Sequence, residues 1–286
     1  MKILIVGCGY VGKALSFELL ERRHEVWGLR RDIHQLKELE YLGLKPLSAS
    51  LLNPNSLTKL PKVDVVIFCQ APSREADNYE DTYYLGTKNL LAMLGSPKPK
   101  KVILISSTSV YGTRDGSWVD EDDNPAAPGY ENKEQEENAK HLLATERLVL
   151  ASGIPANILR LGGIYGSGRH RLQALKEGKI KPSFSDIYIN RIHVEDIVAA
   201  LLLLIEKGKP GEIYLGVDDA PSTQKEFYEW LYAKLSLPKP STESTKVGSV
   251  HGSNKRCVNK KIKKLGLKLK YPSYREGYET LLREAH

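Results

Sequence analysis

The feature that most constrains the fold of this chain is a glycine-rich turn directly behind its first strand. Lys2 to Val6 is a short apolar, β-branched run typical of a strand buried on both faces. Glycines follow at Gly7, Gly9 and Gly12, and a helical apolar pattern comes next. In such a G-x-G-x-x-G turn the first glycine permits a tight turn, the second lets a pyrophosphate approach the backbone, and the third lets the helix pack against the sheet. We therefore predict a dinucleotide site formed by Gly7, Gly9, Tyr10, Val11 and Gly12.

Two alternatives exist for this turn. Gly7 to Lys13 also satisfies GxxxxGK, the start of a nucleoside triphosphate-binding loop, but Ala14 stands where that loop needs a serine or threonine to hold Mg²⁺. A glycine turn that binds nothing is the other alternative. A second strand, predicted from Glu25 to Leu29, completes a strand-helix-strand unit, and this order favours the dinucleotide site over both.

The end of the second predicted strand bears on which dinucleotide is bound. Enzymes that prefer NAD usually place an Asp or Glu there for the ribose 2′-hydroxyl, whereas a 2′-phosphate requires arginine. Here the strand ends in Leu29, Arg30 and Arg31, and Asp32 follows both arginines. Guanidinium groups bind phosphate through paired hydrogen bonds, so we predict NADP in preference to NAD. A solvated surface pair is the alternative for the two arginines.

Strand-like and helical segments continue to alternate along the chain. Buried runs within 44–51, at 63–69 and at 101–106 are separated by helical stretches, which predicts an α/β fold with a Rossmann-like, doubly wound parallel sheet. Ligands bind such sheets at the carboxyl ends of the strands. We therefore expect further cofactor contacts from residues at these strand ends, namely Ser50, Leu51, Cys69, Gln70, Ala71 and Ser106.

Further motifs carry a family resemblance. They are ISSTSVYG at Ile105–Gly112, GTKNLL at Gly86–Leu91, Arg160 with IYGSGR at Ile164–Arg169, and RIHVED at Arg191–Asp196. Together with the glycine turn they resemble the extended short-chain dehydrogenases/reductases, the NAD-dependent epimerases and dehydratases that act mostly on nucleotide sugars. The resemblance covers about residues 1–217, and Tyr271–Tyr278 resembles an atypical branch of the family.

The resemblance implies a division of the chain into two parts. Residues 1–165 and 190–217 would form a Rossmann core that binds NAD(P). Residues 166–189 and 218–286 would form a small C-terminal lobe that binds the substrate.

The resemblance also implies which side chains act on the substrate. The family's catalytic hydroxyl falls on Ser107, which would hydrogen-bond the reacting oxygen. The alternative is a serine that only caps the next segment. Substrate contacts would come from Thr108, Tyr111 and Arg191, with the arginine as a clamp for an anionic group.

The family's general base, a tyrosine followed four residues later by a lysine, is missing from its expected place. When Glu146 is matched to the family's glutamate, the two positions fall on Asn138 and Leu142, and neither side chain can replace the pair. Tyr130 and Lys133 lie near the start of the same predicted helix. Because residues three apart share a helix face, we name Tyr130 with Lys133 as the candidate base.

Composition bears on partners and location. The net charge is +7, but Lys255 to Lys270 carries eight Lys or Arg and no acid, while Asp115 to Glu137 is strongly acidic. A basic segment interrupted by leucines is more typical of a solvated surface than of nucleic-acid binding, so we expect no nucleic-acid partner. No apolar run approaches the ~18 residues of a membrane span. Three cysteines without ligand spacing fit a reducing, cytoplasmic location and no metal site.

Two functions remain open from the sequence. The first is an NADP-dependent oxidoreductase, epimerase or dehydratase acting on a nucleotide sugar or a similar carbonyl or hydroxyl substrate. The second is a non-catalytic NAD(P)-binding redox sensor or regulatory protein, because the glycine turn is intact while the tyrosine and lysine pair is lost. Family members often dimerise through the fourth and fifth helices, so a homodimer is one option for assembly.

Overall fold

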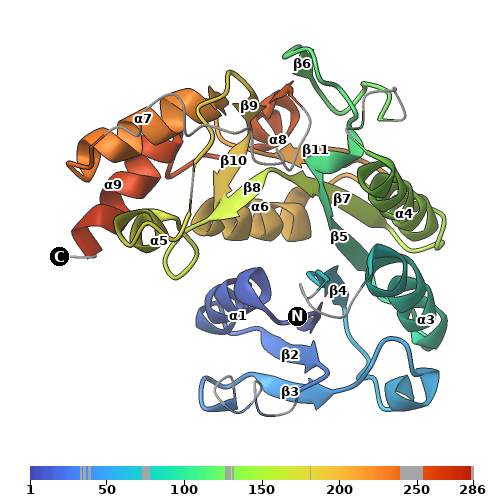
Figure 1. Cartoon of the computed structure of the whole chain (residues 1–286). Coiled ribbons are helices and arrows are strands. Elements are labelled where there is room, and N and C mark those ends of the chain that lie inside the picture. Colours follow the sequence, from blue (N-terminus) through green and yellow to red (C-terminus); the bar gives the residue numbers. More distant parts are fainter. Residues whose placement is uncertain are drawn as a thin grey trace.

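A central parallel sheet forms the body of the protein (Figure 1). The computed structural model describes residues 1–32, 34, 37, 40–72, 78–125, 130, 132–180, 182–238 and 254–284. Within these residues the sheet has seven strands in the order β11-β7-β5-β4-β1-β2-β3, and every pairing between neighbours is parallel. The strands are β1 (Lys2–Val6), β2 (Glu25–Arg30), β3 (Lys45–Ser48), β4 (Val65–Phe68), β5 (Lys101–Ser107), β7 (Ala156–Leu161) and β11 (Ile213–Gly216). The predicted Rossmann-like, doubly wound sheet is confirmed.

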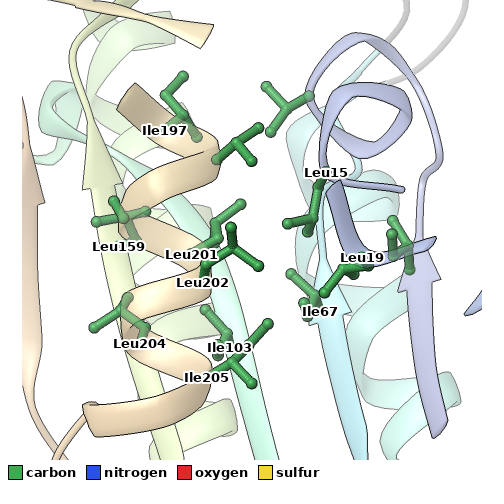
Figure 2. Close-up of a cluster of buried hydrophobic side chains, with 14 of the residues drawn as sticks. Leu15, Leu19, Ile67, Ile103, Leu159, Ile197, Leu201, Leu202, Leu204 and Ile205 are labelled. Carbon is green, nitrogen blue, oxygen red and sulfur yellow. The ribbon is translucent and has the colours of Figure 1, made fainter. Parts of the chain in front are cut away.

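Helices cover both faces of the sheet, because alternate side chains of each strand point to opposite sides. On β1, Ile3 and Ile5 join one hydrophobic cluster, and Leu4 and Val6 join another. The first cluster includes α1 (Tyr10–Glu21) and α6 (Val194–Lys207) (Figure 2). The second includes α3 (Gly86–Met93) and α4 (Lys133–Leu150), on the other side of the sheet in Figure 1.

The turns between these elements include several short helices. Two single turns of 3₁₀ helix, η1 (Pro54–Leu57) and η3 (Thr108–Val110), follow β3 and β5. The helix before α3 is a π-helix, η2 (Glu80–Leu85), which continues into α3 without a break. Such wide turns are frequent at functional sites.

A second layer of short elements lies beyond the β7 and β11 edge of the sheet. Three two-stranded ladders pair β8 (Gly163–Tyr165) with β10 (Arg191–His193), β9 (Tyr188–Ile189) with β12 (Ser222–Thr223), and β6 (Trp118–Val119) with β13 (Arg256–Cys257). The helices of this layer are α5 (Leu172–Lys176), α7 (Gln224–Lys234), α8 (Lys260–Leu265) and α9 (Tyr274–Glu284).

Aromatic side chains hold α5, α7 and α9 together. Tyr165, Phe227, Tyr274 and Tyr278 share one buried cluster with Leu172. Helix α8 differs, because its Ile262 packs into the cluster of the central sheet. The boundary between a cofactor core and a substrate lobe stays a prediction.

Candidate functional site

A cavity of about 1120 Å³ opens along the carboxyl ends of the central strands. This is the edge at which doubly wound sheets bind ligands. The predicted cofactor residues that line it are Gly7, Gly9, Tyr10, Val11, Arg30, Arg31, Ser50, Leu51, Cys69, Gln70, Ala71 and Ser106.

The glycines of the first turn serve three different purposes. Gly7 has a φ of 78°, and a Cβ there would lie 2.5 Å from the Cα of Gln70, so the tight turn requires glycine. Gly12 lies behind the turn, where a Cβ would lie 3.0 Å from the Cγ2 of Ile5. At Gly9 the nearest atom to a Cβ would be 3.9 Å away, so this position is open. A phosphate group can approach the backbone there, in front of the amides that begin α1.

The β2 end of the cavity is basic. Arg30 is the last residue of β2, and its Nη1 donates a hydrogen bond of 2.9 Å to the carbonyl oxygen of Cys8 in the glycine turn. This bond holds one edge of the guanidinium group, which has five N–H donors in total. Arg31 and Asp32 line the cavity next to it, and an Asp32 carboxylate oxygen accepts the backbone N–H of His34. The residue at the strand end, where NAD enzymes place an acid, is therefore an arginine.

Gln70, a residue of the cavity lining, has a buried polar atom that no described residue satisfies. The side chain is 8% exposed, and its Nε2 donates to the Oγ1 of Thr87 at 2.9 Å. Within the described part of the chain its Oε1 has no hydrogen-bond partner. An orphaned buried acceptor costs about 1–3 kcal/mol, which a donor on a bound ligand would recover. The open position at Gly9 and this acceptor both fit a dinucleotide.

Ser107 lines the same cavity at the end of β5. Its Oγ accepts the backbone N–H of Ser109 at 3.1 Å and so caps η3. An accepting hydroxyl keeps its own proton for donation, so the cap and a contact with substrate are compatible. The catalytic role predicted for Ser107 remains a prediction, and its position suits that role.

A buried ion pair supports the strand behind Ser107. Arg160 donates to both carboxylate oxygens of Glu146, at 3.0 and 2.7 Å, and Ser106 donates to the same carboxylate at 2.6 Å. Arg160 also donates to the hydroxyl of Tyr111, which in turn donates to the carbonyl oxygen of Asp120. Burial raises the pKa of Tyr111, so its hydroxyl stays protonated as a donor. Each polar group of this network has a partner, and together they fix the end of β5.

Asn138 and Leu142 are the two residues that the match to Glu146 assigns to the family's base. Asn138 lines the cavity, and Leu142, one turn further along α4, is buried against η3. Glu134, one turn before Asn138, also lines the cavity, as does Tyr79. Burial, with a smaller contribution from Glu134, raises the pKa of Tyr79. The cavity wall that includes Asn138 therefore also holds a carboxylate and a phenol.

Tyr130 and Lys133 are not placed as the shared-face argument assumed. Helix α4 begins at Lys133, so Tyr130 precedes the helix and does not share its face. The Tyr130 hydroxyl donates to the carbonyl oxygens of Val110 at 2.5 Å and Pro125 at 3.2 Å. Burial raises the pKa of Tyr130 and so keeps the phenol protonated, whereas a general base must be deprotonated. Both residues are absent from the described lining of the cavity, so this pair stays a prediction that the geometry does not support.

The three residues predicted to contact substrate are buried elsewhere. Thr108 and Tyr111 belong to η3 and its end, and each is less than a tenth exposed. Arg191 donates to the Oγ of Ser222 at 2.8 Å, and its guanidinium carbon lies 3.8 Å from the ring centre of Phe227. All three are absent from the described cavity lining, and their substrate role also stays a prediction.

Sequence reasoning missed several residues of the cavity wall. Asn78, Tyr79, Thr82 and Tyr83 reach it from the π-helix and the residues before it, and Glu134 and Arg169 from α4 and the turn after β8. A π-helix is rare, and the helical pattern of this stretch gave no reason to expect one. Arg169 did have a signal, since a cation directly follows the Gly-Ser-Gly turn of a recognised motif.

Known proteins are similar to this chain over most of its length. The model of the NAD dependent epimerase/dehydratase family matches residues 3–215. Protein YeeZ of Escherichia coli strain K12 is 27% identical over 281 residues, which cover 95% of this chain and 96% of that protein. A functionally unknown conserved protein from Silicibacter pomeroyi has a solved structure with a TM-score of 0.80, 27% identity, and coverage of 99% of this chain and 98% of that one.

A more distant structure contains a cofactor. The dTDP-glucose 4,6-dehydratase DesIV of Streptomyces venezuelae, solved with NAD and TYD bound, has a TM-score of 0.82 at 20% identity. The match covers 99% of this chain and 96% of that one. At this identity the likeness extends to the fold alone. Within the described residues, no helix has the length and apolar character needed to cross a membrane.

Proposed function

Because the chain belongs to the NAD-dependent epimerase/dehydratase family, we propose that it is an enzyme that uses NADP in preference to NAD. Its substrate would be a nucleotide sugar or a similar molecule with a reacting carbonyl or hydroxyl group. The observation that carries this proposal is the single cavity that joins the open position at Gly9 to the hydroxyl of Ser107. Cofactor and substrate can meet in such a space.

The residues of the cavity suggest how the chemistry would be divided. A bound nicotinamide supplies hydride chemistry. Ser107 donates a hydrogen bond to the oxygen on the reacting carbon, with its own oxygen held by the Ser109 amide. Glu134 accepts or returns the proton of the substrate hydroxyl, and Tyr79 lies beside it on the wall. Asn138 can hydrogen-bond a substrate but cannot take a proton from it.

The cofactor preference rests on the arginines at the end of β2. Arg30 is held against the glycine turn through Cys8, and Arg31 lines the cavity beside it. A 2′-phosphate would bind there through charge-assisted hydrogen bonds. Calorimetry should give a dissociation constant for NADPH at least about tenfold below that for NADH. Equal affinities, or tighter binding of NADH, would remove the NADP preference.

Catalysis is tested by turnover rather than by binding. The purified protein is incubated with NADP or NAD and a panel of nucleotide sugars, and products are followed by NMR because epimerisation and dehydration return the cofactor to its starting redox state. Ser107→Ala should lower the rate by about 10²- to 10⁴-fold. Ser109→Ala is the matched control, since only the Ser109 backbone takes part in the contact. Equal rates in the two variants would exclude Ser107.

A second function is favoured by a specific observation, the replacement of the family's tyrosine and lysine by Asn138 and Leu142. A protein that binds NAD(P) only to report redox state needs the glycine turn but no base. It would bind a partner whose affinity changes with NADPH, and the partner would then change NADPH affinity by the same factor. NADPH binding without turnover of any substrate, together with such a partner, would favour this function over the enzyme.

A further inference from the structure

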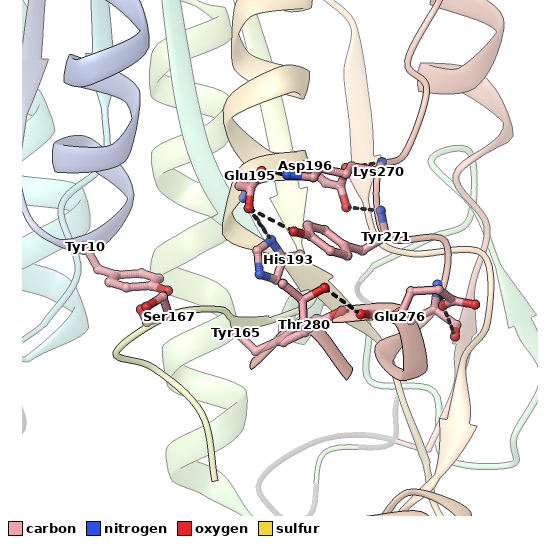
Figure 3. Close-up of polar contacts among 11 residues, drawn as sticks. Tyr10, Tyr165, Ser167, His193, Glu195, Asp196, Lys270, Tyr271, Glu276 and Thr280 are labelled. Atoms are coloured by element: carbon pink, nitrogen blue, oxygen red, sulfur yellow. Dashed lines mark hydrogen bonds and ion pairs between the residues drawn. The ribbon is translucent and has the colours of Figure 1, made fainter. Parts of the chain in front are cut away.

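The turn after β8 sits directly on the first residue of α1. The Tyr10 hydroxyl donates a hydrogen bond of 2.8 Å to the carbonyl oxygen of Ser167 (Figure 3). Gly166 lies against the same hydroxyl, because a Cβ there would be 2.7 Å from it. Tyr10 follows Gly9 in the dinucleotide turn, and Ser167 belongs to the segment that leaves the central sheet. The hydrogen bond therefore joins the turn after β8 to the glycine turn that begins α1.

The turn is built to hold Arg169 in one place. Gly166 and Arg169 exchange two backbone hydrogen bonds, of 3.2 and 2.9 Å, which close residues 166–169 into a tight hairpin. Gly168 has a φ of 70°, which glycine adopts without strain. The chain thus folds back over Tyr10, and the guanidinium carbon of Arg169 lies 5.5 Å from the centre of the Tyr10 ring. This is within the range of a cation–π contact.

Arg169 brings a positive charge to the cavity wall formed by Gly7, Gly9 and Tyr10. A dinucleotide places its pyrophosphate at this turn, where backbone amides and the start of α1 face it from one side. The amides supply partial charges only, whereas a pyrophosphate carries two full negative charges. A guanidinium group on the facing hairpin can hydrogen-bond the phosphate oxygens from the other side.

We propose that Arg169 binds the pyrophosphate of the bound dinucleotide and that the Tyr10–Ser167 hydrogen bond holds the 166–169 hairpin closed over it, an inference that rests on the proposed dinucleotide function. The hairpin continues into residues 170–189, so an occupied cofactor site fixes the start of the segment that leads to α5 and β9. Arg169 is selective for ligands that contain a pyrophosphate over nucleotides that end at the adenosine ribose.

The charge is tested with Arg169→Gln and a pair of ligands. Calorimetry compares NADPH with adenosine 2′-monophosphate, which has the same adenine and 2′-phosphate but no pyrophosphate. Arg169→Gln should weaken NADPH by about 10- to 100-fold and leave the monophosphate within about twofold. The NADPH difference should shrink as salt is raised. Arg147→Gln, which removes an exposed arginine outside the described lining of the cavity, is the control and should change neither affinity.

The role of the Tyr10–Ser167 hydrogen bond is tested with Tyr10→Phe, which keeps the ring under Arg169 and removes only the hydroxyl. NADPH should slow the exchange of the backbone amides of residues 166–169 in the wild type, and this protection should fall in Tyr10→Phe and in Arg169→Gln. Unchanged NADPH affinity in Arg169→Gln, or an equal loss for both ligands, would overturn the inference while leaving the proposed function in place. A wild type that binds neither NADPH nor NADH would instead overturn the proposed function.

Discussion

The two ends of the cavity differ in how they are built. At the glycine end, the backbone itself forms the site. The local surroundings of Gly7, Gly9 and Gly12 explain why each of these positions is a glycine. At the other end, the site consists of side chains that reach the cavity from separate elements, such as Ser107 from β5 and Glu134 from α4. Backbone requirements leave a pattern in the sequence, whereas the meeting of distant side chains does not. The following predictions test this difference.

The largest effect is expected at the buried ion pair behind Ser107. Glu146→Ala would leave the Arg160 guanidinium, 3% exposed, without its carboxylate, and breaking one side of a buried pair costs about 3–5 kcal/mol. Chemical denaturation should show this loss of unfolding free energy. Glu137→Ala, which removes a solvent-exposed ion pair of the same helix, should cost far less, because water screens exposed pairs. A similar cost for both would mean that Arg160 is satisfied by other groups.

Two glycine variants separate the stability of the turn from its function. Gly7→Ala places a Cβ 2.5 Å from the backbone of Gln70 at a φ of 78°, so we expect a stability loss of about 2–4 kcal/mol. Gly9→Ala meets no atom nearer than 3.9 Å, so stability should stay within about 1 kcal/mol while NADPH affinity falls at least about tenfold. Thermal unfolding and calorimetry on both variants give the comparison. An unaffected NADPH affinity in Gly9→Ala would argue against a phosphate at this position.

The glycine end is also the part of the cavity whose structure could be predicted from the sequence alone. The spacing of Gly7, Gly9 and Gly12 predicted the turn, and the order of segments predicted the parallel sheet and its binding edge. The assignment of Asn138 and Leu142 to the places of the missing pair follows from the family resemblance and stays a prediction. Sequence reasoning did not find Tyr79, which lies on the wall directly before the π-helix. It also grouped Tyr130 with Lys133 on a shared helix face, although α4 begins only at Lys133.

Two buried residues at the junction of β10 and α6 should give the protein opposing pH dependences. Burial lowers the pKa of His193 from 6.5 to about 4, so its contribution to stability is present above pH 6.5 and is lost as pH falls toward 4. Burial raises the pKa of Asp196 from 3.8 to about 6, so its contribution is present at low pH and is lost as pH rises toward 6. The two effects oppose each other, and the wild type should have a shallow profile between pH 4 and 6.5.

Replacing His193 should leave the pH dependence caused by Asp196 unopposed. His193→Asn keeps a side chain that can cap α6, as His193 does through the Glu195 amide. The variant should gain roughly 2–3 kcal/mol of stability relative to wild type on going from neutral to acidic pH. Denaturation at several pH values between 4 and 7 measures this change. A profile parallel to that of wild type would show that His193 does not titrate differently in the folded and unfolded states.

The smallest effect is expected for Glu134, which touches the cavity without being needed for the fold. It is exposed at the start of α4, so Glu134→Gln should leave stability within about 0.5 kcal/mol. If its carboxylate transfers the substrate proton, the rate should fall by about 10- to 100-fold and lose its acidic pH dependence, because an amide does not titrate. Glu137→Gln, on the same helix but outside the described lining, should change neither the rate nor its pH profile. An active Glu134→Gln variant with an unchanged pH profile would mean that Tyr79, or a group on the substrate itself, transfers the proton. Glu134 would then contribute only to binding and orienting the substrate.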